Sequence, residues 1–276
     1  MGWHANLSLQ YAVEAGRCVA RFSHDGPLRV LKTLYPEGDK VCHSVLVHPP
    51  GGLVGGDTLD IQVSVKSGAH ALVTTPGAAR FYRSDGEPAL QRTVLHLESG
   101  ARLEWLPLEA ILYTGCKAEN RLTAELAEGA QMIGWDVTSL GLPGADLPFL
   151  KGSFLQHLEL TGQWLERGRI AADDHLLLTS PLGLGGQTCM ATLFFASGNA
   201  LERKQKESLL DAARLCMDAH PLKGHAGVTS AGPRVVVLRV LAAGVEPAMG
   251  LLRQVWLAWR GLAWGRPAVM PRIWAT

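Results

Sequence analysis

The sequence predicts a mainly β protein with stacked or solenoid-like β-sheets and two α-helices in the C-terminal third. Three observations support this fold class. Short apolar runs separated by turn residues fill the first part of the chain, a strand-turn-strand pattern recurs about every thirty residues, and the two clear helical patterns both begin after residue 200. Self-similarity at such a period is typical of stacked units that each bury an apolar face on the next.

The first part of the chain, from Leu7 to about Val47, consists of short runs broken by Gly16, Gly26-Pro27 and residues 36–39. This spacing is typical of strands and turns, and no helical pattern is visible. The segment 59–65 then alternates strictly between apolar and polar residues, which predicts a half-buried strand.

A glycine-rich segment joins these strands and reads His48-Pro-Pro-Gly-Gly-Leu-Val-Gly-Gly-Asp57-Thr58. Proline fixes φ, whereas glycine adopts positive φ or allows a close approach to the backbone, so the segment predicts a rigid double turn. Its only ionisable side chains are those of His48 and Asp57. Either Asp57 caps a purely structural turn, since Gly, Pro and Asp are ordinary turn residues, or the turn aims both side chains at one place.

The repeat combines an alternating strand, a charged residue, a Gly-Ala turn and a second strand. Residues 63–73 match residues 95–105, and residues 126–133 form a weaker copy. We expect these copies to stack on one another. The alternative is three unrelated hairpins that share common turn residues.

Further strands are predicted at residues 154–160, 189–196 and 234–241, the last of them Val-rich and fully buried. A first helix is predicted from about Leu201 to Ala219, and the proline that follows it at position 221 ends it. Its apolar stripe consists of Leu209, Ala213 and Cys216.

A second helix begins near Glu246, with Pro247 as its first helical residue, and ends at Gly265 and Pro267. Its wide, aromatic stripe is formed by Leu252, Val255, Trp256, Trp259 and Leu262. No linker or low-complexity segment divides the chain, so we expect residues 1–276 to form a single domain.

The composition excludes several classes of partner. With 26 basic and 25 acidic residues, the net charge of +1 provides no steering field for nucleic acid or membranes. The chain contains 47% hydrophobic and only 18% charged residues. We therefore expect other subunits to cover part of its surface. No uncharged run reaches membrane-spanning length and no signal peptide is visible.

No Cys-x-x-Cys pair occurs among the five cysteines, which are Cys18, Cys42, Cys116, Cys189 and Cys216. This pattern indicates reduced thiols and a cytoplasmic protein.

Enzyme motifs are absent. Ser180 lies near glycines but lacks a nucleophile elbow, and the glycine-rich segment is neither a dinucleotide nor a phosphate loop because a strand follows it.

Whether the chain binds a metal ion is a more open question. In an extended segment Cys42 and His48 share one face and His43 the other, and a Cys/His pair suits nickel or zinc, although such a pair can equally serve packing.

Asp136 follows a tryptophan in an apolar stretch. A carboxylate buried without a partner costs several kcal/mol or takes up a proton. Asp136 therefore either bonds to a neighbour or lines a wet interior.

Four motifs, in order over nearly the whole chain, resemble those of the UreD/UreH urease accessory proteins. They are residues 48–57, Thr75-Pro-Gly-Ala-Ala-Arg-Phe-Tyr-Arg-Ser84, Leu103-Glu-Trp-Leu-Pro107 and the terminal Pro271-Arg-Ile-Trp-Ala-Thr276. The resemblance implies a mainly β, non-enzymatic maturation factor. Such proteins lie between apo-urease and UreF-type and UreG-type partners while nickel is delivered, without a tightly bound cofactor.

The resemblance also implies roles for individual residues. Asp57 and Asp136 match acids proposed in the family to line an internal nickel passage, and Cys42, His43 and His48 match family positions. The two helical tryptophans and residues 272–274 are expected to serve core or partner packing.

The chain departs from the family pattern at Leu108, at Leu142 and at Asp146-Leu147. A glutamine, an arginine and a glutamate common in the family are missing there, so their roles cannot be transferred.

Two other functions stay open at this stage. One is a nickel store with its own tight site at Cys42, His43 and His48. The other is a hydrolase that uses His48 and Asp57 as an acid-base pair.

Overall fold

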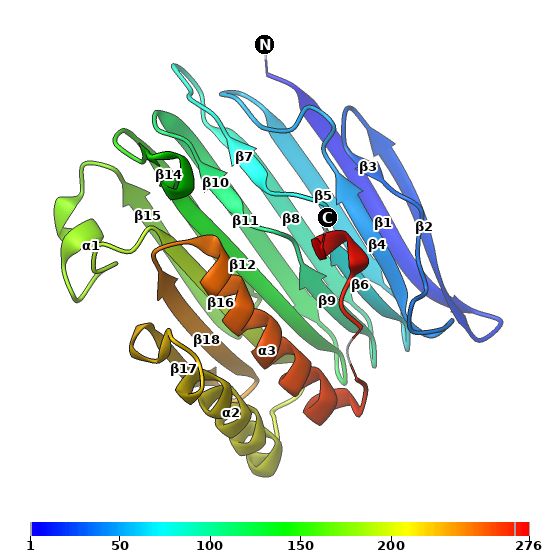
Figure 1. Ribbon diagram of the computed structural model, residues 1–276. Coiled ribbons are helices and arrows are strands. Elements are labelled where there is room, and N and C mark those ends of the chain that lie inside the picture. Colours follow the sequence, from blue (N-terminus) through cyan, green and yellow to red (C-terminus); the bar gives the residue numbers. More distant parts are fainter. Residues whose placement is uncertain (1, 268, 276) are drawn as a thin grey trace.

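The computed structural model describes residues 2–267 and 269–275 and contains two facing β-sheets with helices outside one of them (Figure 1). The first sheet has seven strands in the order β15-β14-β11-β8-β5-β1-β2. Their bounds are β1 (His4–Glu14), β2 (Arg17–Asp25), β5 (Thr58–Val65), β8 (Ala89–Leu97), β11 (Cys116–Leu126), β14 (Gly152–Leu160) and β15 (Trp164–Ala171). Its five central strands are parallel, and an antiparallel strand closes each edge.

The second sheet has eleven strands, eight of them in the order β17-β18-β16-β12-β9-β6-β4-β3 and the short strands β7, β10 and β13 beside this path. Their bounds are β3 (Arg29–Val30), β4 (Cys42–Val47), β6 (His70–Thr74), β7 (Ala79–Phe81), β9 (Arg102–Leu106), β10 (Ala110–Leu112), β12 (Gln131–Leu142), β13 (Leu147–Pro148), β16 (Cys189–Ser197), β17 (Ala226–Gly232) and β18 (Val235–Ala242). The strands predicted at 59–65, 154–160, 189–196 and 234–241 are all present.

The sequence repeat is the stacking unit of the two sheets. The chain passes from the first sheet to the second through three equivalent turns, from β5 to β6, from β8 to β9 and from β11 to β12. The strands before the turns pair in parallel, as do those after them. Gly68, Gly100 and Gly129 occupy the same place in the three turns, with φ of 72°, 68° and 73°, a conformation that favours glycine. The solenoid-like prediction is confirmed.

The two predicted helices are α2 (Arg203–Asp218) and α3 (Val245–Trp264), and both cover the outer face of the second sheet (Figure 1). Two details of the α3 prediction are wrong. The helix begins two residues before Pro247, and Leu262 is 54% exposed because the buried face continues instead through Arg260 to Trp264. The predicted end at Gly265 is confirmed, with φ of 61°.

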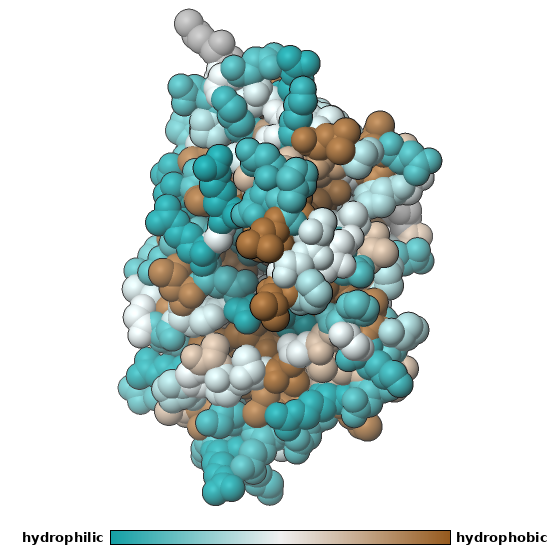
Figure 2. All heavy atoms as spheres, turned by 90° about the vertical axis from the view of Figure 1, so that its left-hand side faces the viewer, coloured by the Kyte–Doolittle hydropathy of each residue, from teal (hydrophilic) through white to brown (hydrophobic). Residues whose placement is uncertain are grey.

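A third helix, α1 (His175–Thr179), was not expected from the sequence. It is a single turn, too short for a periodic pattern, and the Asp174 carboxylate caps it by accepting from the backbone N–H of Leu177 at 3.0 Å. The space-filling view of this face shows apolar side chains among polar ones (Figure 2). Exposed leucines near α1 include Leu176 and Leu182. The 3₁₀ turns are η1 (Pro143–Ala145), η2 (Lys223–His225) and η3 (Arg272–Ala275).

Two apolar cores result from this arrangement. One lies between the sheets, and the other lies between the second sheet and the helices. Trp256 and Trp259 are fully buried in the outer core, which confirms their packing role. The Trp274 ring lies 5.4 Å from the Trp135 ring at a tilt of 38°, and its indole N–H donates to the Thr74 hydroxyl at 2.8 Å. Thr276, the end of this motif, lies outside the described residues.

A buried ion cluster fastens α3 to the second sheet. Arg260 donates to Glu104 at 3.0 Å and also to Glu37, and all three side chains are almost completely buried. The Glu104 carboxylate also pairs with His70 at 2.8 Å and accepts from Trp256 at 2.7 Å. Buried charges require such partners, because leaving one of them alone is costly.

Replacing Arg260 with Ala should lower the free energy of unfolding by about 3–5 kcal/mol, because both carboxylates lose their buried cation. Urea denaturation measures this change. The matched control is Arg203→Ala, which removes an exposed ion pair with Glu207 on α2 and should cost less than about 1 kcal/mol. Equal effects of the two substitutions would contradict the role assigned to the cluster.

Candidate functional site

The glycine-rich segment forms the double turn that the sequence predicts. The backbone N–H of Gly51 donates to the carbonyl of His48 at 2.9 Å, and that of Asp57 donates to the carbonyl of Val54 at 3.0 Å. Leu53 lies between the two turns, is 1% exposed and bridges to β7. The turn is therefore anchored at both ends and at its centre.

Two glycines of the segment are required by close packing. A Cβ added at Gly52 would lie 2.2 Å from the Tyr82 ring, and one added at Gly55 would lie 2.0 Å from the Ser84 hydroxyl. Both neighbours belong to the second family motif. The two motifs thus form one packed unit at the same end of the sheets.

Asp57 is 7% exposed, and both of its carboxylate oxygens accept backbone hydrogen bonds. Oδ1 accepts from the N–H of Trp3 at 2.8 Å, and Oδ2 accepts from the N–H of Val54 at 2.9 Å. Of the two interpretations left open by the sequence, this geometry supports the turn cap. It also ties the start of β1 to the double turn.

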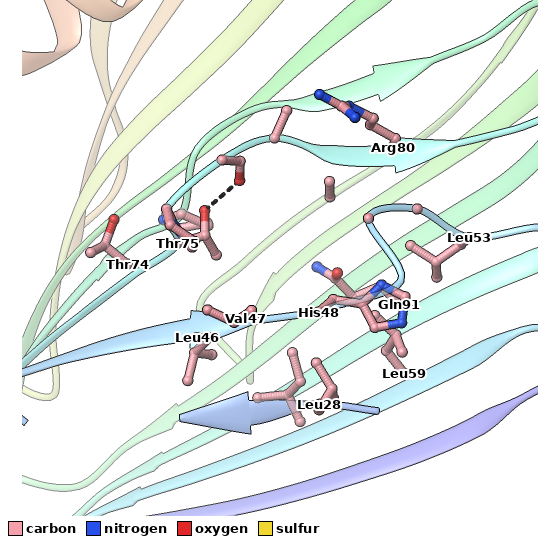
Figure 3. A pocket seen from close by; sticks show the side chains of 18 of the residues that line it. Leu28, Leu46, Val47, His48, Leu53, Leu59, Thr74, Thr75, Arg80 and Gln91 are labelled. Atoms are coloured by element: carbon pink, nitrogen blue, oxygen red, sulfur yellow. Dashed lines mark hydrogen bonds between the residues drawn. The ribbon is translucent and has the colours of Figure 1, made fainter. Parts of the chain in front are cut away.

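His48 lines a cavity of about 250 Å³ between the sheets, together with Arg80 and Gln91 (Figure 3). Burial lowers the pKa of His48, and the negative charge of Asp57 partly opposes this shift. The imidazole is therefore neutral at physiological pH, which is the form that binds metal ions.

A ladder of amide side chains begins in the wall of this cavity. Gln91 on β8, Asn120 on β11 and Gln156 on β14 lie directly opposite one another across the parallel strands. Gln91 donates to the Asn120 carbonyl oxygen at 3.3 Å. All three occupy inward positions that alternation reserves for apolar residues.

Asp136 reaches this ladder from the opposite sheet. Its carboxylate accepts from Asn120 at 2.7 Å and from Gln156 at 2.6 Å, with the Thr138 hydroxyl at 3.4 Å. We call Gln91, Asn120, Asp136 and Gln156 the polar row. Of the two alternatives that the sequence left open for Asp136, the structure shows bonds to neighbouring side chains.

The protonation of Asp136 is unusual for an aspartate. Burial raises its pKa to about 6, and the charge of Glu166 adds to the rise, while hydrogen bonds from Gln156, Thr138 and Asn120 oppose it. The carboxyl therefore changes charge close to neutral pH. A group of this kind can exchange a proton for a metal ion.

The sequence predictions did not include the three amides of the polar row. A signal was available, because Asn120 and Gln156 each interrupt an otherwise apolar inward face. Asn120 stands between Ala118 and Leu122, and Gln156 stands between Phe154 and Leu158. Only the pairing of the strands places these residues beside one another.

Cys42 and His43 project to opposite sides of β4, as predicted. Cys42 is fully buried, and its hydrogen bond with Cys18 together with burial raises the pKa of its thiol. His43 pairs with Glu37 at 2.7 Å. Within the described ranges, no group of three or more His, Cys, Asp or Glu side chains is placed to hold a metal ion.

The fold and the site define a class: a two-sheet, solenoid-like β protein with a row of polar side chains in its interior. In the part of the chain that the structure describes, no helix is both long and apolar enough to cross a membrane.

Comparison with known proteins identifies the family. The sequence profile described as UreD urease accessory protein matches residues 4–275. Two curated proteins named urease accessory protein UreD, from Albidiferax ferrireducens and Variovorax paradoxus, are 66% and 65% identical over the full length of both chains. One from Leptothrix cholodnii is 52% identical, again over the full length of both chains. The chain belongs to the UreD family of urease accessory proteins.

Asp136 should make stability depend on pH. Its folded pKa exceeds the ordinary value of 3.8, so the proton it holds stabilises the fold at low pH, and this contribution is lost as pH rises through about 6. Relative to Asp136→Asn, the wild-type protein should lose up to about 3 kcal/mol of unfolding free energy between about pH 4 and pH 7.5.

Denaturant unfolding at several pH values tests this expectation. Asp211→Asn, on the exposed surface of α2, controls for charge removal away from the interior. A difference between wild type and Asp136→Asn that stays constant with pH would contradict the raised pKa.

Proposed function

We propose that this protein is a non-enzymatic scaffold for nickel insertion into apo-urease. It bridges apo-urease and UreF-type and UreG-type partners and passes nickel through its interior. Full-length membership of the UreD family supports the urease role. The single structural observation that carries the passage is the polar row, which starts at Gln91 in the lining of the His48 cavity and continues across β11 and β14.

The chemistry of the polar row suits transit of a metal ion. Nickel accepts imidazole and carboxylate ligands, and the route offers the His48 ring, the Asp136 carboxylate and amide oxygens. No thiol belongs to the polar row, so the row lacks the cysteine ligands that would bind the ion tightly. Because Asp136 titrates near neutral pH, a passing cation displaces a proton and the returning proton favours release.

The tight storage site is not favoured by the structure. Cys42 and His43 lie on opposite sides of β4, and His43 is already paired with Glu37. The hydrolase is not favoured either, because both oxygens of Asp57 are occupied by backbone N–H groups. We therefore retain transient nickel as the cargo, with no resident cofactor.

The surface near α1 is our candidate for partner contact. A hollow of about 580 Å³ lies between η1, β13 and the segment after α1, and Leu147 in its wall is half exposed. Leu150, Leu176 and Leu182 nearby are more exposed still. Covering such residues favours association, so the purified protein should be poorly soluble without its UreF-type partner. Its free thiols fit a cytoplasmic location.

The double substitution Asp57→Ala with Asp136→Ala should leave urease synthesised but poor in nickel. The readouts are urease activity and nickel content per urease, measured in cells that express all accessory proteins. Asp60→Ala is the matched control, since this acid lies on β5, the strand that follows the double turn, but pairs with His4 outside the interior. Deleting the protein should have the same effect as the double substitution.

The single substitutions separate transit from folding. Asp57→Ala removes a turn cap and should also weaken partner complexes, whereas Asp136→Asn should leave complexes intact and still lower nickel content. Pull-down of the urease proteins measures the complexes. Full nickel loading in the double variant with complexes intact would exclude the transit role, and full loading in the deletion strain would exclude the scaffold.

A further inference from the structure

A second cavity, of about 450 Å³, lies beside the turns that join the two sheets. We call it the basic cavity. It shares no lining residue with the cavity at His48, so it is separate from the proposed nickel route. Its lining is Val13, Gly16, Cys18, Lys40, Gly68, His70, Gly100, Arg102 and Arg266.

Three cations converge on this cavity without an acid among its lining residues. They are Lys40, Arg102 and Arg266. Among residues 2–267 and 269–275, none of the three forms an ion pair. Nearby acids are already engaged, because Asp39 pairs with Arg17 at 3.2 Å and Glu98 pairs with Lys66 at 2.7 Å.

The convergence has an electrostatic cost. Arg102 and Arg266 line the same cavity, and two like charges so placed repel each other. Burial lowers the pKa of Arg102, and the positive charge of Arg266 lowers it further. The Arg102 guanidinium lies over the face of the Trp264 ring, 5.7 Å from its centroid. A protein of net charge +1 has no general excess of cations to explain this local one.

Among the lining residues that the structure describes, only the Cys18 thiol can supply negative charge. A hydrogen bond from Cys42 lowers the pKa of Cys18 to about 7, and burial opposes the shift. His70 adds little charge, because burial lowers the pKa of its imidazole ring. The same ring is hydrogen-bonded to Glu104. Even with Cys18 ionised, the basic cavity keeps a surplus of two positive charges.

The shape of the rim leaves room for a ligand. Gly16, Gly68 and Gly100 adopt positive φ, and a Cβ added at any of them would meet nothing within 4 Å. The turns therefore border open space, and the lysine and arginine side chains among the lining residues are cationic. Arginine presents a planar fork of donors that matches phosphate and carboxylate oxygens, and lysine adds a point charge.

We propose that the basic cavity binds a small oxyanion of the phosphate class, held by Arg102, Arg266 and Lys40. Two or more negative charges on the ligand would balance the surplus of the lining. This inference is independent of nickel transit, because the basic cavity and the polar row have no residue in common.

The first test is titration calorimetry of the full-length protein with inorganic phosphate. We expect saturable binding with one phosphate per chain. Arg266→Gln and Arg102→Gln should each weaken binding about tenfold or more, since each removes a charge-assisted hydrogen bond. The matched control is Arg214→Gln on α2, where the arginine pairs with Asp211, and it should leave the affinity unchanged.

The second test is thermal unfolding in low-salt buffer. Phosphate should raise the melting temperature of the wild-type protein more than chloride at equal ionic strength. Arg266→Gln should raise the melting temperature without phosphate, because it removes a repulsion, and should abolish the response to phosphate. If Arg266 instead stabilised the fold, Arg266→Gln would lower the melting temperature without phosphate.

Two outcomes would overturn the proposal. The first is an equal rise in melting temperature with phosphate and with chloride, which would mean that both anions act only by screening the charges. The second is unchanged phosphate affinity in both arginine variants when their melting curves show folded protein.

Discussion

The parallel register of the repeated strands is the constraint on which the rest of the structure depends. Three equivalent turns with left-handed glycines send the chain from one sheet to the other, and each copy hydrogen-bonds to the next in the same alignment. Because side chains alternate along a strand, a slip of one residue would exchange the inner and outer faces. Gln91 and Asn120 would then leave the interior, and Asp136 would lose its donor from β11.

The interior between the sheets combines two kinds of environment. Most inward positions are apolar and fully buried, whereas the polar row crosses from one sheet to the other. Buried polar groups are tolerated when they are hydrogen-bonded, and Asp136 satisfies this condition through amides of two different strands. Burial nevertheless raises the pKa of Asp136 to about 6, so this carboxyl can change charge close to neutral pH.

The sequence predicted the parts of the fold that depend on local pattern. The repeat, the strand at 59–65 and the two long helices each carry a periodicity or turn signal, and the structure contains them. It missed α1, which has too few residues for a period, and the polar row. The hydrogen-bonded members of that row are 16 to 29 residues apart in sequence and meet only through strand pairing and the packing of the two sheets. The buried face of α3 was also misplaced at Leu262, since an arginine at position 260 is not expected in a core until Glu37 and Glu104 are seen beside it.

The antiparallel strands at the two edges of the first sheet bear on self-assembly. A solenoid made of parallel copies offers the same unpaired backbone at each end and can in principle grow by adding further chains. Here β2 and β15 reverse direction and carry exposed charges, including Arg21 and Arg169. Charged residues on an edge strand disfavour pairing with another sheet, so these two strands limit growth of the first sheet at both of its edges.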